Sequence, residues 1–529
     1  MTMMMRLYEL DAFHQASGHL HRWYLCAGSR GYQSRGTDKP ARVTWLPLVG
    51  QWESVAVEAA GAGGGSALRT ADLRLMNVRQ ADTLPRWANV FDVTAGTWLR
   101  AELGVRPLNA LLTDYVIRTI VVKEVDEAAA YSTAVTVWRA KAGMLQPDKT
   151  ELRLPLWDRL ADFDTPVLPP EAAYAGTGGL EGPATLAGVT KERCFGWCPI
   201  VAPTYLGVVG GKHTYSVNGG KPIEGIVRGW DKAAPYQLVT GTPSSSASPA
   251  QFSVDVATGI ITIGGGKPED FRVEVKGTKT GGVWHRYIGQ IIAHLATTHG
   301  GIIGAASVVG MDATPRTAGL FLPAGDTTTH RAAYDKLVGS VARGRWYIDL
   351  TDSLIVTRLP RATAATPLRS YRKAAGEADG LRPIAGNSDV PAKQVIVRHS
   401  ENTSPAVQTA TAATADDTAL WTKQWREAQS AVNATVAAAW GVAAKPAYVE
   451  TALTVTADAA AEAPLWLAEK ADPPRQYELR VRDGAPGFWI GDAVTVTDDI
   501  AGFEAGATAV IYGRTNRERG GGAILYLER

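Results

Sequence analysis

The chain has 529 residues, 45% of them hydrophobic and 20% charged, and its 54 basic and 52 acidic residues leave a formal net charge of +2. This length exceeds what one hydrophobic core supports and predicts roughly three to five domains, while the apolar content excludes a disordered chain. The near-neutral balance gives the chain no long-range attraction to nucleic acid, and three cysteines exclude a disulfide framework as the main source of stability.

Neither a secretion signal nor a membrane span is expected. Glu9 and Asp11 interrupt the apolar residues near the start, and no basic segment precedes them. The apolar run at 300–310 is rich in glycine and much shorter than the roughly 20 residues needed to cross a bilayer. We therefore expect a soluble protein that is made in the cytoplasm.

Short alternating runs of apolar and polar residues dominate the N-terminal part. Val135 and Val137 fall on one face of an extended chain and Thr136 and Trp138 on the other, which is the period of two of a β-strand. A connector rich in proline and glycine follows this part. The sequence thus predicts a β-rich N-terminal domain over 1–165, with Trp138 in a packing role.

The middle of the chain divides into two parts that differ in their predicted secondary structure. Residues 166–245 predict strands and turns, and end in a serine- and proline-rich stretch typical of a surface loop or linker. An α+β domain is expected over 246–380. It would hold a hairpin turning at Thr258-Gly259, a helix over 283–298 that ends at Gly300, a second helix that begins at a threonine, and two strands around the turn at 351–353.

The last domain is expected over 381–529. Its alanine-rich segment at 416–441 predicts a helix, which Asn433 and Thr435 would shorten, and 461–470 predicts another short one. The chain then closes with three apolar stretches separated by glycines, beginning at the sequence GFWIGDAVTVTDD. This pattern predicts an antiparallel meander, in which Trp489 would have a packing role.

Cys194 and Cys198 stand four residues apart in the sequence CFGWC. Zinc and redox sites usually use Cys-x-x-Cys, and zinc sites need further ligands. The next residue able to ligate is His213, and no second cysteine pair occurs. A metal or iron–sulfur role therefore competes with the more common role of free cysteine as a small buried residue.

Other catalytic and ligand-binding patterns are weak. The stretch from Gly207 to His213 lacks the spacing and the hydroxyl of a phosphate-binding loop, so it predicts a glycine-rich turn. Two groups of histidines lack the i, i+4 pair with an acidic neighbour that marks zinc proteases: His14, His19 and His21, and His285, His294 and His299.

No Gly-x-Ser-x-Gly motif occurs, whereas a glycosidase carboxylate pair need only converge in space and stays open. We predict no catalytic, cofactor-binding or metal-ligating residues, no cofactor and no enzymatic activity.

A succession of short motifs resembles the tail-tip or baseplate hub proteins of long-tailed bacteriophages and of related prophages and gene transfer agents. The resemblance runs along much of the chain in order. It is carried by Gly176, Gly178-Gly179, Glu181-Gly182, Leu186-x-Gly188, Phe195-Gly196, the strand at Tyr215-Ser216-Val217, the stretches 223–231 and 252–263, and the closing GFWIGDAVTVT.

This resemblance implies a homotrimeric hub at the distal end of the tail tube of a virion, synthesised in the host cytoplasm. The implied fold is a β-rich, multidomain α+β chain with two tail-tube-like β-barrel modules and an intervening α+β domain. Three chains would present six modules and so adapt sixfold tail symmetry to a threefold tip. Implied partners are the distal tail protein, the tape-measure protein, a tip fibre or receptor-binding protein and the host envelope, and DNA would pass without sequence-specific binding.

Two other functions compete with the hub. A receptor- or glycan-binding tail module would use the 16 tryptophans as sugar-stacking platforms. A tail-associated cell-wall hydrolase would need a catalytic pair and an additional domain, and the sequence offers no recognisable pair and no extra segment of about 100 residues outside the hub resemblance. Clustered exposed tryptophans would favour the glycan-binding module, and tryptophans buried at a threefold interface would favour the hub.

Overall fold

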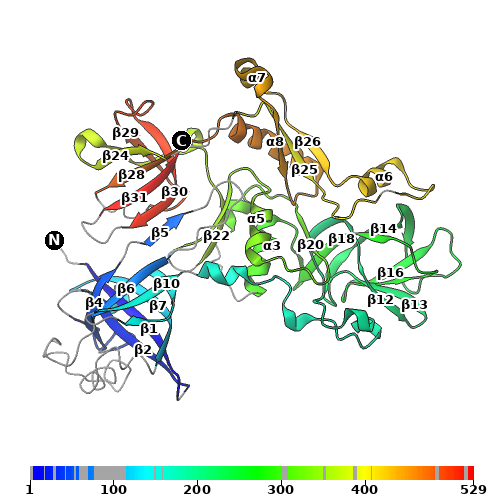
Figure 1. Ribbon diagram of the computed structural model, residues 1–529, viewed down its shortest axis with the longest axis horizontal. Helices are drawn as coiled ribbons and strands as arrows, with labels where there is room; N and C mark the ends of the chain where they lie inside the picture. The colour runs from blue at the N-terminus through cyan, green and yellow to red at the C-terminus, as the bar shows by residue number, and fades with distance from the viewer. Residues whose placement is uncertain are drawn as a thin grey trace.

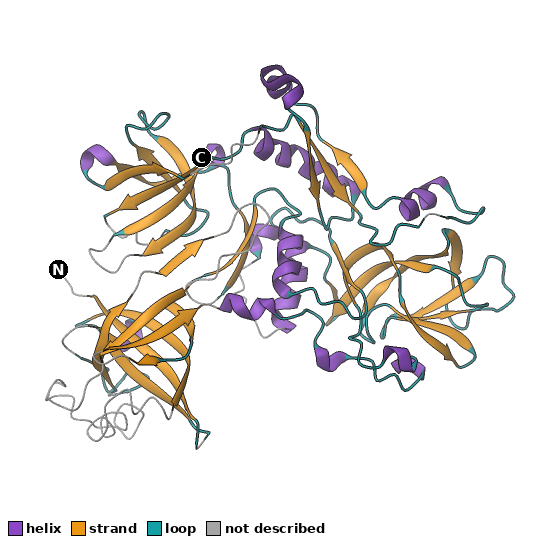
Figure 2. Cartoon of the chain, in the orientation of Figure 1, coloured by secondary structure: helices purple, strands orange, loops and turns teal. Residues whose placement is uncertain are grey.

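The computed structural model describes residues 4–16, 18–27, 31–41, 43–52, 55–58, 70–76, 115–147, 151–157, 159–298, 308–349, 353–384, 390–406, 408–482, 488–516 and 522–529. Two barrel-like modules lie on one side, a large sheet lies on the opposite side, and a helical block stands between them (Figures 1 and 2). The β-rich, multidomain α+β fold class predicted from the sequence is confirmed. No described helix is long and apolar enough to cross a membrane.

The N-terminal module is a closed barrel of seven strands, because β2 and β4 pair in parallel and leave no edge. Its core contains Trp23 and Trp138, and Trp138 is only 2% exposed whereas Val135 is 64% exposed, as the period of two predicts. The seven strands of the ring are β1 (Met4–His14), β2 (Leu20–Ala27), β4 (Thr44–Trp52), β6 (Thr70–Met76), β7 (Tyr115–Asp126), β8 (Val135–Ala142) and β10 (Glu151–Trp157). Two short strands pair with members of the ring: β3 (Tyr32–Gln33) with β4 and β9 (Gln146–Pro147) with β10.

A ten-stranded sheet forms the opposite side of the molecule. Its strands are β11 (Arg193–Val201), β12 (Thr204–Val209), β13 (Lys212–Ser216), β14 (Ile223–Asp231), β15 (Ala234–Leu238), β16 (Gln251–Asp255), β17 (Ile260–Ile263), β18 (Phe271–Thr280), β19 (Val283–Trp284) and β20 (Gly319–Leu322). The boundary expected at 245 falls inside this sheet, because β15 and β16 pair across it and their strands share one core. The hairpin predicted at Thr258-Gly259 is confirmed, and Gly259 has the positive φ of +66° that such a turn favours.

The central block packs helices and short strands around the largest apolar core. It contains α3 (Ile288–Thr298), α4 (Val309–Asp312), α5 (His330–Val338), and the strand pair β21 (Gly344–Ile348) and β22 (Leu354–Arg358). The threonine predicted to begin the second helix is Thr329, whose side chain accepts a hydrogen bond from the Ala332 N–H at 3.2 Å. The helix predicted over 283–298 begins only at Ile288, because 283–284 pair with β18; Gly300 lies outside the described residues.

The segment after residue 390 returns to the central block and contains β25 (Gln394–His399), α6 (Ala415–Thr422), β26 (Arg426–Gln429), α7 (Ala434–Trp440), β27 (Pro446–Glu450) and α8 (Thr456–Ala471). The single helix predicted over 416–441 is wrong. Its middle, β26, is drawn into a sheet with β25, and Asn433 caps a new helix by accepting from the Val436 N–H. The short helix predicted at 461–470 is confirmed within the longer α8.

The C-terminal module is a seven-stranded sheet built from distant stretches of chain. Its strands are β5 (Val55–Glu58), β23 (Pro367–Arg372), β24 (Ala378–Pro383), β28 (Gln476–Val481), β29 (Ala493–Thr497), β30 (Ala507–Asn516) and β31 (Ala523–Glu528). The predicted meander is confirmed by the antiparallel β29–β30 and β30–β31 pairs. The boundary expected at 380 falls within β24, and β5 comes from the N-terminal part of the sequence.

Candidate interdomain junction

The two modules are joined directly by one strand. After β4 completes its part of the N-terminal barrel, β5 crosses to the C-terminal sheet and pairs antiparallel with β30 from Gly513 to Asn516. The two modules therefore lie next to each other, as Figure 1 shows at the left of the view. Because the backbone hydrogen bonds of a sheet fix register and direction, this pairing holds a segment of the N-terminal part of the chain in the C-terminal sheet.

Helix α8 presents a line of carboxylates to the central block. Glu462 and Glu469 are seven residues apart and so lie on one face of the helix. Glu462 has no exposed side-chain surface; it pairs with Arg316 and Arg358, each at 2.8 Å, and accepts from a backbone N–H. A buried charge is tolerated only with such partners, so this carboxylate fixes α8 against the strands of the block.

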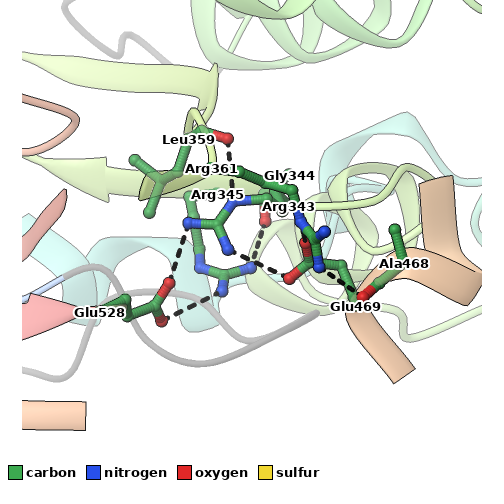
Figure 3. A network of polar contacts seen from close by, with 8 residues as sticks. All are labelled: Arg343, Gly344, Arg345, Leu359, Arg361, Ala468, Glu469 and Glu528. Carbon is green, nitrogen blue, oxygen red and sulfur yellow. Dashed lines mark hydrogen bonds and ion pairs between the residues drawn. The ribbon is translucent and has the colours of Figure 1, made fainter. Parts of the chain in front are cut away.

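A second buried network connects the central block to the C-terminal module (Figure 3). Glu528, on the last strand, is 3% exposed and lies 3.0 Å from the Arg343 guanidinium and 3.7 Å from that of Arg345. Arg343 also contacts Glu469 on α8 at 3.0 Å, and Arg361 reaches the other oxygen of the same carboxylate at 2.7 Å. One chain of ion pairs thus links three elements that are far apart in the sequence.

Arg343 is held in an unusual backbone conformation. Its φ of +58° lies in the left-handed region, which residues other than glycine rarely adopt. Its side chain donates to the Leu359 carbonyl at 3.0 Å in addition to its two ion pairs. Burial lowers the pKa of the neighbouring Arg345 from its ordinary value, so these guanidiniums lie where water screens charge poorly.

A polar cavity of about 650 Å³ opens beside this network, with Arg361, Arg475 and Arg529 among its lining residues. A second cavity of about 460 Å³ lies against the N-terminal barrel. Each acidic side chain that lines the second cavity is paired with a basic one: Glu9 with Lys123 at 3.0 Å, Asp11 with Arg22 at 2.8 Å and Asp162 with Lys141 at 2.6 Å. The acidic lining residues of the first cavity are Asp472 and Glu528, and Glu528 is paired with Arg343. The lining of these two cavities therefore presents no pair of unpaired carboxylates of the kind that glycoside hydrolysis uses.

The two cysteines of CFGWC lie on β11 and are buried as free thiols. Burial raises the pKa of the Cys194 thiol well above its ordinary value, which disfavours the thiolate that reacts or binds metal. Cys198 donates to the Phe195 carbonyl at 3.5 Å. No group of three or more potential ligands with metal-binding geometry occurs among the described residues.

The glycine-rich stretch from Gly207 to His213 forms the hairpin of β12 and β13, as predicted. Gly210 and Gly211 occupy its turn with positive φ values of +59° and +77°. The chain continues into β13 and not into a helix, so no helix N-terminus is present to bind phosphate.

The two histidine groups differ in what they contact. His14 and His19 bond through their backbones at the β1–β2 turn, and nothing is described of the His21 side chain or of His299. His285 lies ahead of α3, and its ring stacks on that of His294 with centroids 4.6 Å apart. Burial lowers the pKa of both rings, that of His294 to about 4.

Sequence reasoning missed the residues of the junction. Glu462, Glu469 and Glu528 occur in an ordinary alanine-rich helix and a short closing strand, and their arginine partners lie more than 100 residues away. The only local signal is that Glu528 occupies a buried register position in a strand of apolar residues.

Comparisons with known proteins give structural matches only. No protein-family model matches the chain, and no curated protein matches it in sequence. A tail protein from Neisseria meningitidis MC58 is 10% identical with a TM-score of 0.40, and the match covers 99% of this chain and 96% of that one. The 43 kDa tail protein of prophage MuSo2 from Shewanella oneidensis is 9% identical with a TM-score of 0.39, with the same two coverages of 99% and 96%.

A chain from the virion of a native gene transfer agent particle is 14% identical with a TM-score of 0.39, and the match covers 64% of this chain and 84% of that one. The structural neighbours are thus phage-type tail proteins and a gene transfer agent particle.

Proposed function

We propose that this chain is a structural tail protein and, more specifically, a hub subunit that forms a trimeric ring at the distal end of a tail tube. The observation that carries the proposal is the presence, in one chain, of two barrel-like modules joined by the β5–β30 pairing. Three copies would present six such modules, which matches a sixfold tube to a threefold tip. Closed cyclic symmetry of this kind is the usual form of homo-oligomers.

The interdomain junction supports a mechanical role. A ring that joins a tube must hold its modules at fixed angles, and the buried networks around Glu462 and Glu528 connect α8, the central strands and the C-terminal module in that way. Buried ion pairs add little net stability but specify one arrangement, because any other arrangement leaves a charge unpaired. The ion pairs of the junction therefore hold the elements in place, which supports a structural role and not a catalytic one.

The proposed place of the ring at the end of the tube implies its partners and its relation to DNA. The ring would contact the distal tail protein and the tape-measure protein on one side, and a tip fibre or receptor-binding protein and the host envelope on the other. DNA would pass through the bore transiently. The net charge of +2 suits such a bore, since an excess of basic side chains would bind phosphate and hold the DNA back.

The burial of the tryptophan side chains distinguishes between the two proposed functions, hub and glycan-binding module. Trp23, Trp45, Trp138, Trp230, Trp346 and Trp421 are fully buried in cores within the chain. Among the described residues, Trp440 at 48% and Trp489 at 52% are the exposed ones, and they belong to different parts of the fold. Two separate rings do not form a sugar-stacking platform, so the hub is the better supported function.

The mass of the purified chain in solution, measured by light scattering and followed by imaging, tests the proposal. We expect three times the chain mass of 56.3 kDa and a threefold ring with six peripheral modules. A ring of any other order would overturn the threefold hub. A stable monomer would favour the glycan-binding module, and a glycan screen would then be the next experiment.

A further inference from the structure

The polar cavity beside the interdomain junction has a volume of about 650 Å³ and an excess of basic side chains in its lining. Its charged lining residues are the arginines Arg343, Arg361, Arg475 and Arg529 and the acidic residues Asp472 and Glu528. The volume falls in the range of pockets that hold small molecules. The cavity is therefore large enough for a ligand, and its charge favours an anion.

The backbone places two of these arginines directly opposite each other. The Arg475 N–H, just before β28, donates to the Arg529 carbonyl at 2.8 Å, and the Arg529 N–H, just after β31, donates to the Arg475 carbonyl at 3.0 Å. Residues that exchange both hydrogen bonds of an antiparallel pair have their side chains on the same face of the sheet. Like charges in such positions repel, and an anion between them would remove the repulsion.

Neither of these two arginines is neutralised by the described part of the chain. Arg475 and Arg529 make no ion pair with any described side chain, and Asp472 makes none with either of them. Arg343 and Arg361, in contrast, are both paired with Glu469. The cavity thus contains two facing cations without a counter-ion, next to two that already have one.

Other groups of the lining prepare the cavity for an oxyanion. The Arg529 guanidinium lies over the Phe503 ring at 4.9 Å from its centroid, a contact that holds the group and uses none of its N–H donors. The hydroxyls of Thr363 and Thr508 also line the cavity and make no hydrogen bond to any described group. Guanidinium and hydroxyl donors are therefore available together.

We propose that this cavity binds a phosphate group. A phosphate has about two negative charges and three or more terminal oxygens, so it can accept hydrogen bonds from both facing guanidiniums and from a hydroxyl. A single carboxylate has one charge and two oxygens and would leave one of the two arginines without a counter-charge. Inorganic phosphate and a phosphate monoester of a small molecule present the same group. The site lies within one chain, so the inference goes beyond the proposed hub and does not depend on the ring.

Isothermal titration calorimetry of the full chain with sodium phosphate at constant ionic strength tests the proposal. We expect one phosphate per chain with a dissociation constant in the millimolar range or below, and no binding of sodium acetate. The absence of phosphate binding at millimolar concentration, or acetate binding of equal strength, would overturn the proposal.

Variants assign the binding to this cavity. Arg475→Gln should weaken phosphate binding about tenfold, because it removes one of the two facing cations. Asp472→Asn should strengthen binding, because it removes an exposed carboxylate from the lining. The control is Arg482→Gln, at an exposed arginine of the same module that pairs with Asp379 at 3.0 Å outside the cavity lining, and it should leave the affinity unchanged. Equal affinities of the wild type and Arg475→Gln would overturn the site.

A thermal measurement separates binding from an effect on folding. Without phosphate, Arg475→Gln should unfold at the wild-type midpoint, since the residue is exposed. Phosphate should raise the midpoint of the wild type and change that of the variant much less, because a ligand stabilises only the folded state that binds it. An equal rise for both chains would contradict the proposed site.

Glycerol phosphate distinguishes the two sources of the group. Tighter binding of this ester than of inorganic phosphate would support an organic phosphate that fills the rest of the cavity. Binding of inorganic phosphate at least as tight would support the free ion. The mass of the assembly tests the hub and phosphate affinity tests this site, so the failure of one proposal leaves the other in place.

Discussion

The two barrel-like modules reach a similar shape by different means. The N-terminal barrel closes by backbone pairing of β2 with β4, and all its strands lie within residues 4–157, from which only β5 leaves for the C-terminal sheet. The C-terminal module draws strands from three parts of the chain, and its end strands β23 and β24 do not pair with each other. There, Asp498 bridges the gap by accepting from the Leu381 N–H and contacting Lys373.

This difference indicates where each module is vulnerable. A closed barrel filled with apolar side chains loses stability chiefly when its core loses volume. A module completed by distant strands and held by buried ion pairs depends on charges that lie outside it. The first module is therefore sensitive to cavities, and the second to the loss of single charged groups at its boundary.

The largest effect is expected from Trp138→Ala in the N-terminal barrel. The ring is 2% exposed within the core of that barrel, and its removal should lower the free energy of unfolding by ~3–5 kcal/mol. Urea unfolding followed by tryptophan fluorescence and circular dichroism measures the change. Val135→Ala, on the outer face of the same strand, is the control and should have little effect; equal losses for the two variants would contradict the inside–outside assignment.

The next effect is expected from Glu528→Gln at the C-terminal module. The change keeps the shape but leaves Arg345 buried without its carboxylate, and breaking a buried pair in this way costs about 3 kcal/mol. Urea unfolding of the variant measures this loss. Asp379→Asn breaks an exposed pair with Arg482 in the same module and should cost under ~1 kcal/mol. The comparison between the two modules fails if the two variants unfold at the same midpoint.

Sequence patterns predicted the features that depend on interactions between residues close together in the sequence. The alternation around Trp138, the turn at Gly259 and the N-cap at Thr329 all depend on residues within a few positions, and the structure confirms them. Features decided by distant partners were not predictable. An alanine-rich stretch became β26 because β25 offered a strand to pair with, and nothing in β5 reveals that its partner is β30.

The residues of the candidate site also show that contacts between distant residues could not be predicted from the sequence. Cys194 and Cys198 attracted attention because their spacing is visible in the sequence, and both are buried as free thiols on β11. Glu528 and Arg343 were invisible because they are 185 positions apart and meet only after the central block and the last strand have folded. A buried ion pair between distant residues has no sequence signature of its own.

Acid should affect the region between the modules through two buried histidines. Burial lowers the pKa of His294 and of His399 to about 4, from an ordinary value near 6.5. The unfolded chain therefore binds more protons than the folded one below pH 6.5, so stability is full above that pH and falls as the pH drops from 6.5 to 4. Urea midpoints measured at pH 7.5, 5.5 and 4.5 should decrease in that order.

The matched variant carries His294→Gln and His399→Gln together. It should reduce this pH dependence between 6.5 and 4, because neither glutamine takes up a proton, while His285, whose pKa burial also lowers, remains. Both rings belong to the central region, on α3 and β25, and to neither barrel module. A pH dependence that survives the double change would assign the acid sensitivity to other groups and weaken the contrast drawn here.

The smallest effect on folding is expected from Trp489→Ala, because the packing role predicted for this residue has little support within the single chain. The ring is 52% exposed, whereas its neighbour Phe488 is 6% exposed and belongs to the core of the C-terminal module. The local turn is held by the backbone of residue 489, whose N–H donates to Asp492 at 2.7 Å, and alanine keeps that bond. The free energy of unfolding should change by under ~0.5 kcal/mol for Trp489→Ala and by ~3–5 kcal/mol for Phe488→Ala.

The adjacent residues Phe488 and Trp489 thus test which side chains are buried within one chain and which contact another subunit. If Trp489→Ala leaves the unfolding midpoint unchanged but lowers the mass of the assembled ring, the C-terminal module contacts another subunit through that ring. If it changes neither, the exposed tryptophan has no part in the assembly. A loss of stability equal to that of Phe488→Ala would instead show that the loop is buried within the module.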